Sequence, residues 1–207
     1  REAGLRFRQQ FRHAVSQNLF YDIRLSYYQY EFQRSVNDWS PGEYSRALFT
    51  TFSNSLFYQN MSSSVYETQS TKVYTLKGDM TWQFDRLNLV KAGIELKAND
   101  LDYYYNSNPV NPTDQVVNLY RKKPMEGAAY VQDKIEFETI ILNLGLRYDF
   151  FDAATSYPRD PFNPTDPLQG PLNTKAQSML SPRVGIAYPV TANMVFHFTY
   201  GQFFQRP

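Results

Sequence analysis

Strict alternation of apolar and polar side chains limits the folds open to this chain more than any other feature. In residues 140–150, large apolar side chains occupy the even positions, whereas Asn143, Gly145, Arg147 and Asp149 lie between them. Successive side chains of a strand point to opposite faces, so a period of two predicts a strand with one apolar face. The sequence therefore predicts an all-β chain of about eight strands, at residues 4–13, 18–34, 71–84, 88–99, 126–137, 140–151, 181–188 and 194–204.

The connections between these segments are of two very different lengths. Short turns at 14–17, 85–87, 138–139 and 189–193 alternate with long loops at 35–70, 100–123 and 152–180. In an antiparallel up-and-down meander, this order places every short turn at one end of the strands and every long loop at the other. Loops beyond about 12–15 residues are uncommon in compact domains unless they are functional. The layout is typical of a transmembrane β-barrel of the outer-membrane type.

Charged residues are nearly confined to one strand face. In a barrel the apolar face meets lipid, and an Arg or Lys there would cost roughly 2–4 kcal/mol at mid-membrane. A soluble β-sandwich predicts the same alternation, with the apolar face inward, so the alternation alone leaves both folds open. Aromatic residues near the strand ends favour the membrane barrel. In that fold the residues expected to face the lumen are Arg24, Lys91, Glu95, Arg147, Asp149 and Arg183.

Composition excludes several other classes of protein. The chain has 207 residues, with 21 Lys and Arg against 20 Asp and Glu. This near-neutral balance argues against nucleic acid as a partner, since phosphate binding requires a basic surplus. The lack of cysteine excludes a disulfide framework and thiolate metal sites. No apolar run approaches the length of about 18 residues that a transmembrane helix requires.

The sequence offers no catalytic motif, and neither a cofactor nor a metal is expected. His13 and His197 are the only histidines, and no carboxylate lies near either at metal-ligand spacing. No Gly-rich phosphate loop, nucleophile elbow or zinc-protease motif is present. Asp160 and Asp166 lie in a proline-rich loop without the ordered spacing of a calcium loop. We therefore expect a protein that is not an enzyme.

Aromatic residues in the long loops are the candidates for contact with a ligand. Such side chains form platforms for sugars, peptides or metal chelates, although they could equally continue the aromatic girdle of a barrel. Tyr103, which is nearest a strand, is expected to belong to the girdle. The candidates are Trp39, Tyr44, Tyr104 and Tyr105.

Three segments of the second half carry a family resemblance. They are GAAYVQDKIEFETIILNLGLRYDFFD at Gly127–Asp152, SPRVGIAYPVT at Ser181–Thr191, and FTYGQFFQRP at Phe198–Pro207. In this order and spacing they resemble the β-barrel of TonB-dependent outer-membrane receptors. The likeness is closest to receptors that carry an N-terminal carboxypeptidase-regulatory-like domain, whereas residues 1–123 match in style only.

The resemblance implies a barrel of about 22 strands in the outer membrane of a Gram-negative bacterium. Such a receptor takes up a scarce nutrient, for example a siderophore, glycan, peptide or vitamin, with energy delivered through TonB. Its partners would be outer-membrane lipid, its own plug domain and the TonB–ExbB–ExbD system, and a surface lipoprotein is a further candidate. This chain would contribute wall strands and three extracellular loops.

The chain also departs from the family pattern. It offers about eight strands, no plug and no TonB box, and it stops at Arg206–Pro207 rather than on an aromatic strand residue. We therefore expect it to be a mid-barrel segment whose plug lies outside it. Two alternatives remain at this stage: a soluble β-sandwich that binds carbohydrate through Trp39 and Tyr104, and a small eight-stranded structural barrel of the outer membrane.

Overall fold

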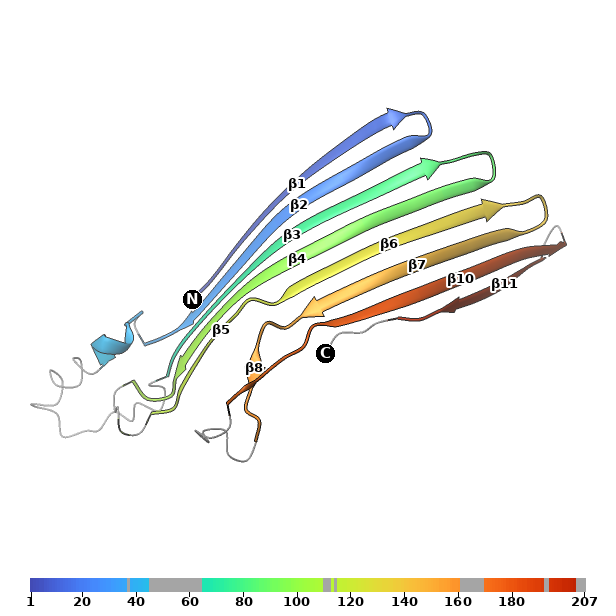
Figure 1. The fold of residues 1–207 in the computed structure, drawn as a ribbon. Helices are drawn as coiled ribbons and strands as arrows, with labels where there is room; N and C mark the ends of the chain where they lie inside the picture. Colours follow the sequence, from blue (N-terminus) through green and yellow to red (C-terminus); the bar gives the residue numbers. More distant parts are fainter. Residues whose placement is uncertain are drawn as a thin grey trace, which may run out of the picture. The chain divides into compact units, whose positions relative to one another are not determined.

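In a computed structural model of the chain, the residues described are 1–36, 38–44, 65–109, 113, 115–160, 170–191 and 194–203. Within them, consecutive antiparallel strands form one sheet in the order β1-β2-β3-β4-β6-β7-β10-β11 (Figure 1). Strand β5 pairs with β4 beside this path, and β8 and β9 form a separate two-stranded sheet. The predicted all-β antiparallel meander is therefore confirmed.

Four strands are longer than the sequence predicted, namely β1, β3, β4 and β10. Their bounds are β1 Glu2–Ser16, β2 Leu19–Arg34, β3 Tyr66–Gln83, β4 Asn88–Asn106, β5 Val117–Lys122, β6 Met125–Glu136, β7 Ile141–Asp152, β8 Ser156–Tyr157, β9 Leu172–Asn173, β10 Gln177–Thr191 and β11 Met194–Gly201. Most of the expected loop 35–70 lies outside the described residues, but its last part belongs to β3.

The expectation of an irregular loop over 100–123 was wrong for much of that range. Strand β4 continues to Asn106, and β5 pairs with it from Leu101 opposite Lys122 to Asn106 opposite Val117. The acidic residues that interrupt the apolar pattern are compensated across the pair, since Arg121 Nε lies 2.9 Å from Asp102 Oδ1. The expected loop 152–180 likewise contains β8, β9 and the start of β10.

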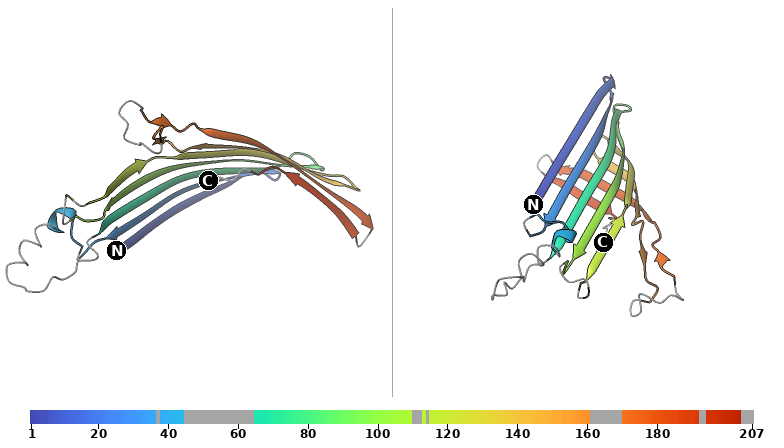
Figure 2. Two further views of the ribbon diagram at one scale, coloured as in Figure 1. Left: turned by 90° about the horizontal axis from the view of Figure 1, so that it is seen from below. Right: turned by 90° about the vertical axis from the view of Figure 1, so that its left-hand side faces the viewer.

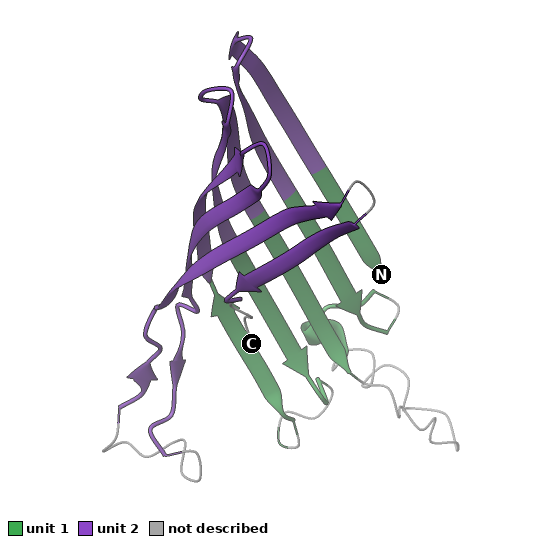
Figure 3. Cartoon of the chain, turned by 90° about the vertical axis from the view of Figure 1, so that its right-hand side faces the viewer, with its two compact units in different colours: residues 1–6, 28–73, 99–123 green, residues 7–27, 74–98, 124–207 purple. Residues whose placement is uncertain are grey.

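The chain divides into two compact units, which Figure 3 shows in different colours. Unit 1 comprises residues 1–6, 28–73 and 99–123, and unit 2 comprises residues 7–27, 74–98 and 124–207. Strands β1 to β4 therefore contribute to both units. Within unit 2, strands β6, β7, β10 and β11 lie in a single layer (Figure 2). No helix of the described residues is long and apolar enough to span a membrane.

One face of unit 2 is apolar and uncovered. The strand registers place Val184 beside both Leu144 on β7 and Tyr200 on β11. Ile186 similarly lies beside Leu142 and Phe198, in the next row of the same face. Large apolar side chains on this face are about half exposed, including Phe196, Phe198 and Tyr200 at 50–59%. We call it the apolar face, and its extent indicates a surface that requires an apolar partner.

Asp133 is an exception on the apolar face. It lies opposite Val90 on β4 and Leu144 on β7, near the turn end of β6. Its Oδ1 atom is buried and has no hydrogen-bond partner among the described residues. The sequence showed this departure, because Asp133 has the same parity as the apolar residues Val131 and Ile135.

Candidate functional site on the polar face

The opposite face of unit 2 gathers the charged residues, and we call it the polar face. One row across four strands consists of Lys91, Gln132, Gly145 and Arg183. The next row along the strands contains Gly93, Tyr130, Arg147 and Ser181. Glu95 and Asp149 follow in the row beyond, each beside Ala128. The structure thus brings together on one face the residues that the sequence grouped as lumen-facing.

Arg24 joins this face through a cluster around Asp22. The Asp22 carboxylate is 3% exposed and accepts hydrogen bonds from Gln10, Arg12 and Arg24. Arg24 also contacts Asp79, with 3.0 Å between Nη2 and Oδ2. A buried carboxylate is tolerated only where such partners replace water, so this cluster stabilises an otherwise costly charge.

Tyr130 of β6 extends the same cluster across β4. Its hydroxyl donates a hydrogen bond to Asp79 Oδ1 at 2.8 Å. The ring lies over Gly93, where an added Cβ atom would be 2.8 Å from both Asp79 Oδ1 and Tyr130 Cζ. Only glycine leaves room for the ring at this point, because Cβ atoms do not approach other heavy atoms so closely. The small residue and the aromatic residue are therefore a matched pair.

Arg147 and Asp149 form the second cluster. Arg147 Nε lies 2.9 Å from Asp149 Oδ2, and Nη2 donates to Oδ1 at 3.0 Å. This forked geometry is the strongest form of a charge-assisted hydrogen bond between side chains. Asp149 is only 6% exposed, so it depends on the guanidinium. Ser181, the neighbour of Arg147 on β10, is 1% exposed, and its Oγ atom lacks a hydrogen-bond partner within the described residues.

Glu95 lies at the centre of a third, more open cluster. Its carboxylate oxygens are each 3.4 Å from an ammonium nitrogen, that of Lys77 or that of Lys97. Lys97 also lies 4.0 Å from Glu126. These groups are about one third exposed, so each pair contributes little stability alone. Together they keep this part of the polar face close to neutral.

Three of the predicted ligand-binding aromatics belong to one packed cluster in unit 1. Trp39 packs edge-on against Tyr44, Tyr44 against Tyr66, and Tyr66 against Tyr104, with centroids 5.8–6.4 Å apart. Tyr44 is 1% exposed, and its hydroxyl accepts from the Val36 amide at 2.7 Å. Tyr44 therefore holds the cluster together, whereas Trp39 and Tyr104 keep partly exposed rings.

A second aromatic pair was not singled out from the sequence. Tyr103 stacks on Tyr120 of β5 with centroids 5.1 Å apart, and its hydroxyl lies 3.2 Å from Glu67 Oε1. Glu67 is in turn paired with Arg34. Tyr105, the fourth predicted aromatic, is two residues farther along β4 and so points to the same side as Tyr103. The pair was missed because Tyr120 fell in a segment expected to be a loop.

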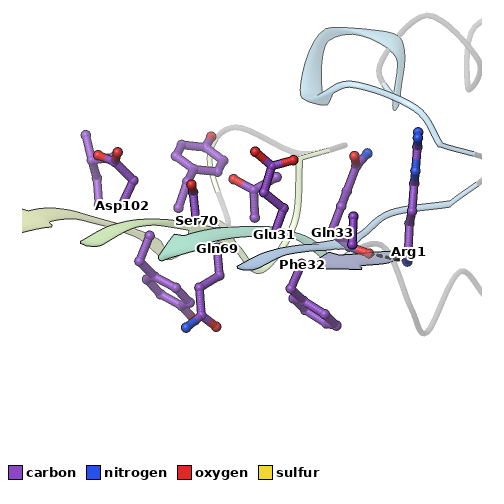
Figure 4. A pocket seen from close by; sticks show the side chains of 12 residues that line it. Arg1, Glu31, Phe32, Gln33, Gln69, Ser70 and Asp102 are labelled. Atoms are coloured by element: carbon purple, nitrogen blue, oxygen red, sulfur yellow. Dashed lines mark hydrogen bonds between the residues drawn. The ribbon is translucent and has the colours of Figure 1, made fainter. Parts of the chain in front are cut away.

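Unit 1 also contains a hollow of about 350 Å³ (Figure 4). The side chains of Glu31, Ser70 and Asp102 project to one side of the sheet there, and Phe32 and Gln69 project to the other. The carboxylates of Glu31 and Asp102 thus lie on one side. Both residues have the same parity along β2 and β4 as the large apolar residues of those strands. This side of unit 1 therefore carries two acidic groups beside Tyr104 and Leu119.

Metal binding finds no support in the described residues, which contain no group of three or more His, Asp or Glu side chains suited to an ion. His13 instead packs against the rings of Phe11 and Tyr21, with centroids 6.3 and 5.4 Å away. Asp166, which was considered for calcium, lies outside the described residues.

Comparison with known families agrees with this two-faced sheet. The family model described as "TonB dependent receptor-like, beta-barrel" matches residues 2–207, which is nearly the whole chain. No curated protein matches the chain. Members of the matched family are transporters of the outer membrane rather than enzymes. The protein therefore belongs to the TonB-dependent receptor β-barrel family.

Proposed function

We propose that residues 1–207 form part of the wall of a receptor that takes up a scarce nutrient across the outer membrane of a Gram-negative bacterium, with energy delivered through TonB. The observation that carries this proposal is the separation of faces along β4, β6, β7 and β10. The wall of a membrane barrel contacts lipid on its outer face and a polar lumen on its inner face. An apolar face and a charged face on one sheet suit these two environments.

The polar face would line the lumen and contact the receptor's own plug domain. Its ion pairs are largely satisfied within the wall, as Arg147–Asp149 and Arg24–Asp22 show. A satisfied, rigid wall gives a plug a fixed surface to pack against, while the plug is moved by the TonB–ExbB–ExbD system. In this arrangement the chain contributes no catalytic residue.

Ligand capture would fall to the long-loop end of the strands in unit 1. We propose Trp39, Tyr104 and Tyr105 as contacts for a siderophore, glycan, peptide or vitamin, with Tyr103 stacked on Tyr120 as a further platform. Tyr44 would act as a positioning residue, since its side chain is buried beneath Trp39. The carboxylates of Glu31 and Asp102 in this unit are consistent with strands that extend beyond the lipid. A surface lipoprotein would meet the receptor at this end.

The alternatives receive less support. A soluble β-sandwich requires two sheets packed face to face, whereas the long strands of the described residues form one sheet. A small eight-stranded barrel would need only these strands, but the family match favours a segment of a larger receptor, with about 22 strands and a plug elsewhere.

Uptake by whole cells tests the proposal. Cells that express the full receptor should deplete a nutrient from defined medium, and depletion should stop in a strain that lacks TonB. Tyr105→Ala should reduce ligand binding, with His197→Gln on β11 as a folded control far along the chain. A receptor that stays monodisperse in water without detergent, or that supports equal depletion without TonB, would contradict the proposal.

A further inference from the structure

We propose that the row Lys91–Gln132–Gly145–Arg183 on the polar face is a binding site for an anionic group, either a carboxylate or a phosphate. The site lies on the face proposed to line the lumen, but the argument for it uses only the geometry and charge of unit 2. It therefore stands or fails separately from nutrient uptake.

Gly145 opens a hollow at the centre of this row. Strand registers place Gln132 on one side of Gly145 and Arg183 on the other, with Lys91 beyond Gln132. A Cβ atom added to Gly145 would meet the Cβ atoms of Gln132 and Arg183 at 3.4 and 3.7 Å, so the glycine leaves a gap between flanking side chains. The resulting hollow has a volume of about 210 Å³, and it is also lined by Tyr130, Val131, Leu146 and Arg147.

The charges around the hollow do not balance. Arg147 is neutralised by Asp149, and in the adjoining row Lys134 pairs with Glu136. Lys91 and Arg183 form no ion pair within the described part of the chain, where every other cation near the hollow has a carboxylate. The Arg183 guanidinium instead lies 5.0 Å from the ring centre of Phe203. Two uncompensated cations therefore border one hollow from opposite sides.

Lys91 and Arg183 would attract an anion into the hollow and would repel a cation. Like charges on the two sides repel, and a negative group between them is attracted to both. The forked guanidinium of Arg183 suits the paired oxygens of a carboxylate or phosphate, and the Lys91 ammonium adds a second donor. The side-chain amide of Gln132, which flanks Gly145, can act as a further donor.

Two sources could supply the anionic group: a small anion in solution, or an acidic side chain from another segment of the receptor. Purified full receptor in detergent distinguishes them. Phenylglyoxal modification of Arg183 is followed by mass spectrometry with inorganic phosphate and with chloride at equal ionic strength. Arg86, exposed in the turn after β3, reports non-specific effects in the same sample.

A free anion predicts that phosphate slows modification of Arg183 severalfold and saturably, with no change at Arg86. Gly145→Asp, which places a carboxylate in the hollow, should slow the reaction without phosphate. Lys91→Gln should weaken protection by phosphate, and it tests the site even if Gly145→Asp fails to fold. Heat-modifiable mobility on gels checks the folding of each variant.

An internal carboxylate predicts a different pattern. Arg183 should react slowly even in chloride, and carbodiimide should link Lys91 to an Asp or Glu of another segment as an amide, with loss of water. The proposal is overturned if Arg183 reacts at the rate of Arg86 in both salts and Lys91 forms no such link.

Discussion

Gly93 and Tyr130 illustrate how single residues shape the polar face. The ring of Tyr130 occupies the space of a side chain at Gly93 and bonds to Asp79. We expect Gly93→Ala to displace the ring and to cost about 1–3 kcal/mol of stability, as overpacking usually does. Urea unfolding of the folded receptor, followed by gel mobility, measures this. Gly78→Ala is the matched control, because its Cβ would meet Ile94 at an ordinary 3.5 Å. Equal midpoints for the two variants would contradict the expectation.

The Arg147–Asp149 pair gives a second prediction at this scale. Arg147→Met should cost about 1–3 kcal/mol, because it removes two charge-assisted hydrogen bonds from a buried carboxylate. Asp149→Asn in the same background should recover part of the loss, since the buried charge is then gone. A double-mutant cycle of unfolding free energies measures the coupling. Strictly additive effects would show that the two side chains act independently.

Residue roles were only partly predictable from the sequence. Alternation within a strand was enough to group Lys91, Arg147 and Arg183 on one face, because parity is a local property. Alternation does not say which residues of neighbouring strands are opposite each other, since register depends on turns and pairing. The contact between Tyr130 and Asp79, which are 51 positions apart, could therefore not be predicted from the sequence.

At the scale of elements, the β3–β4 hairpin shows a turn organised by one carboxylate. Asp85 accepts hydrogen bonds from the amides of Leu87 and Asn88 at 2.7 and 2.8 Å. The Leu87 amide first, and then the Asn88 side chain and amide, hold the pKa of Asp85 below its ordinary 3.8. Because the pKa of Asp85 is lower in the folded turn than in the unfolded chain, the carboxylate stabilises the turn fully at pH values above its unfolded pKa. This stabilisation is lost as the pH falls through the folded pKa.

Hydrogen exchange tests this turn. Asp85→Asn at neutral pH should speed exchange of the Leu87 and Asn88 amides, because a neutral side chain is a weaker acceptor. In the unsubstituted protein the same amides should lose extra protection only below about pH 4. The amides of the β6–β7 turn at 137–140 are the internal control. Protection that is unchanged by the substitution would exclude a role for the carboxylate.

The β4–β5 pair shows why some elements escaped prediction. Asp100 and Asp102 interrupt the apolar alternation that marks a membrane strand, so a loop was predicted for residues 100–123. The structure compensates them with Arg121 and Lys123 on the paired segment. Charge compensation between strands is a tertiary property, and a single strand does not reveal it.

For the whole molecule, the alternation predicted the all-β meander, and the family match resolved the choice that alternation left open. A sheet packed in a soluble core and a sheet facing lipid share the same pattern, since both hide one apolar face from water. Because the chain belongs to a family of outer-membrane barrels, the exposed apolar face of unit 2 is interpreted as a surface that contacts lipid. The central claim is that this face meets lipid and the opposite face does not.

Spin labels at consecutive positions 142–147 of β7 in the full receptor, reconstituted in bilayers, test that claim most directly. Labels at Leu142, Leu144 and Leu146 should be relaxed strongly by oxygen, which concentrates in lipid, and weakly by a water-soluble nickel reagent. Labels at Asn143, Gly145 and Arg147 should lack this lipid signature. Oxygen accessibility that does not alternate along the strand, or nickel accessibility that is highest at Leu144, would contradict a lipid-facing apolar face.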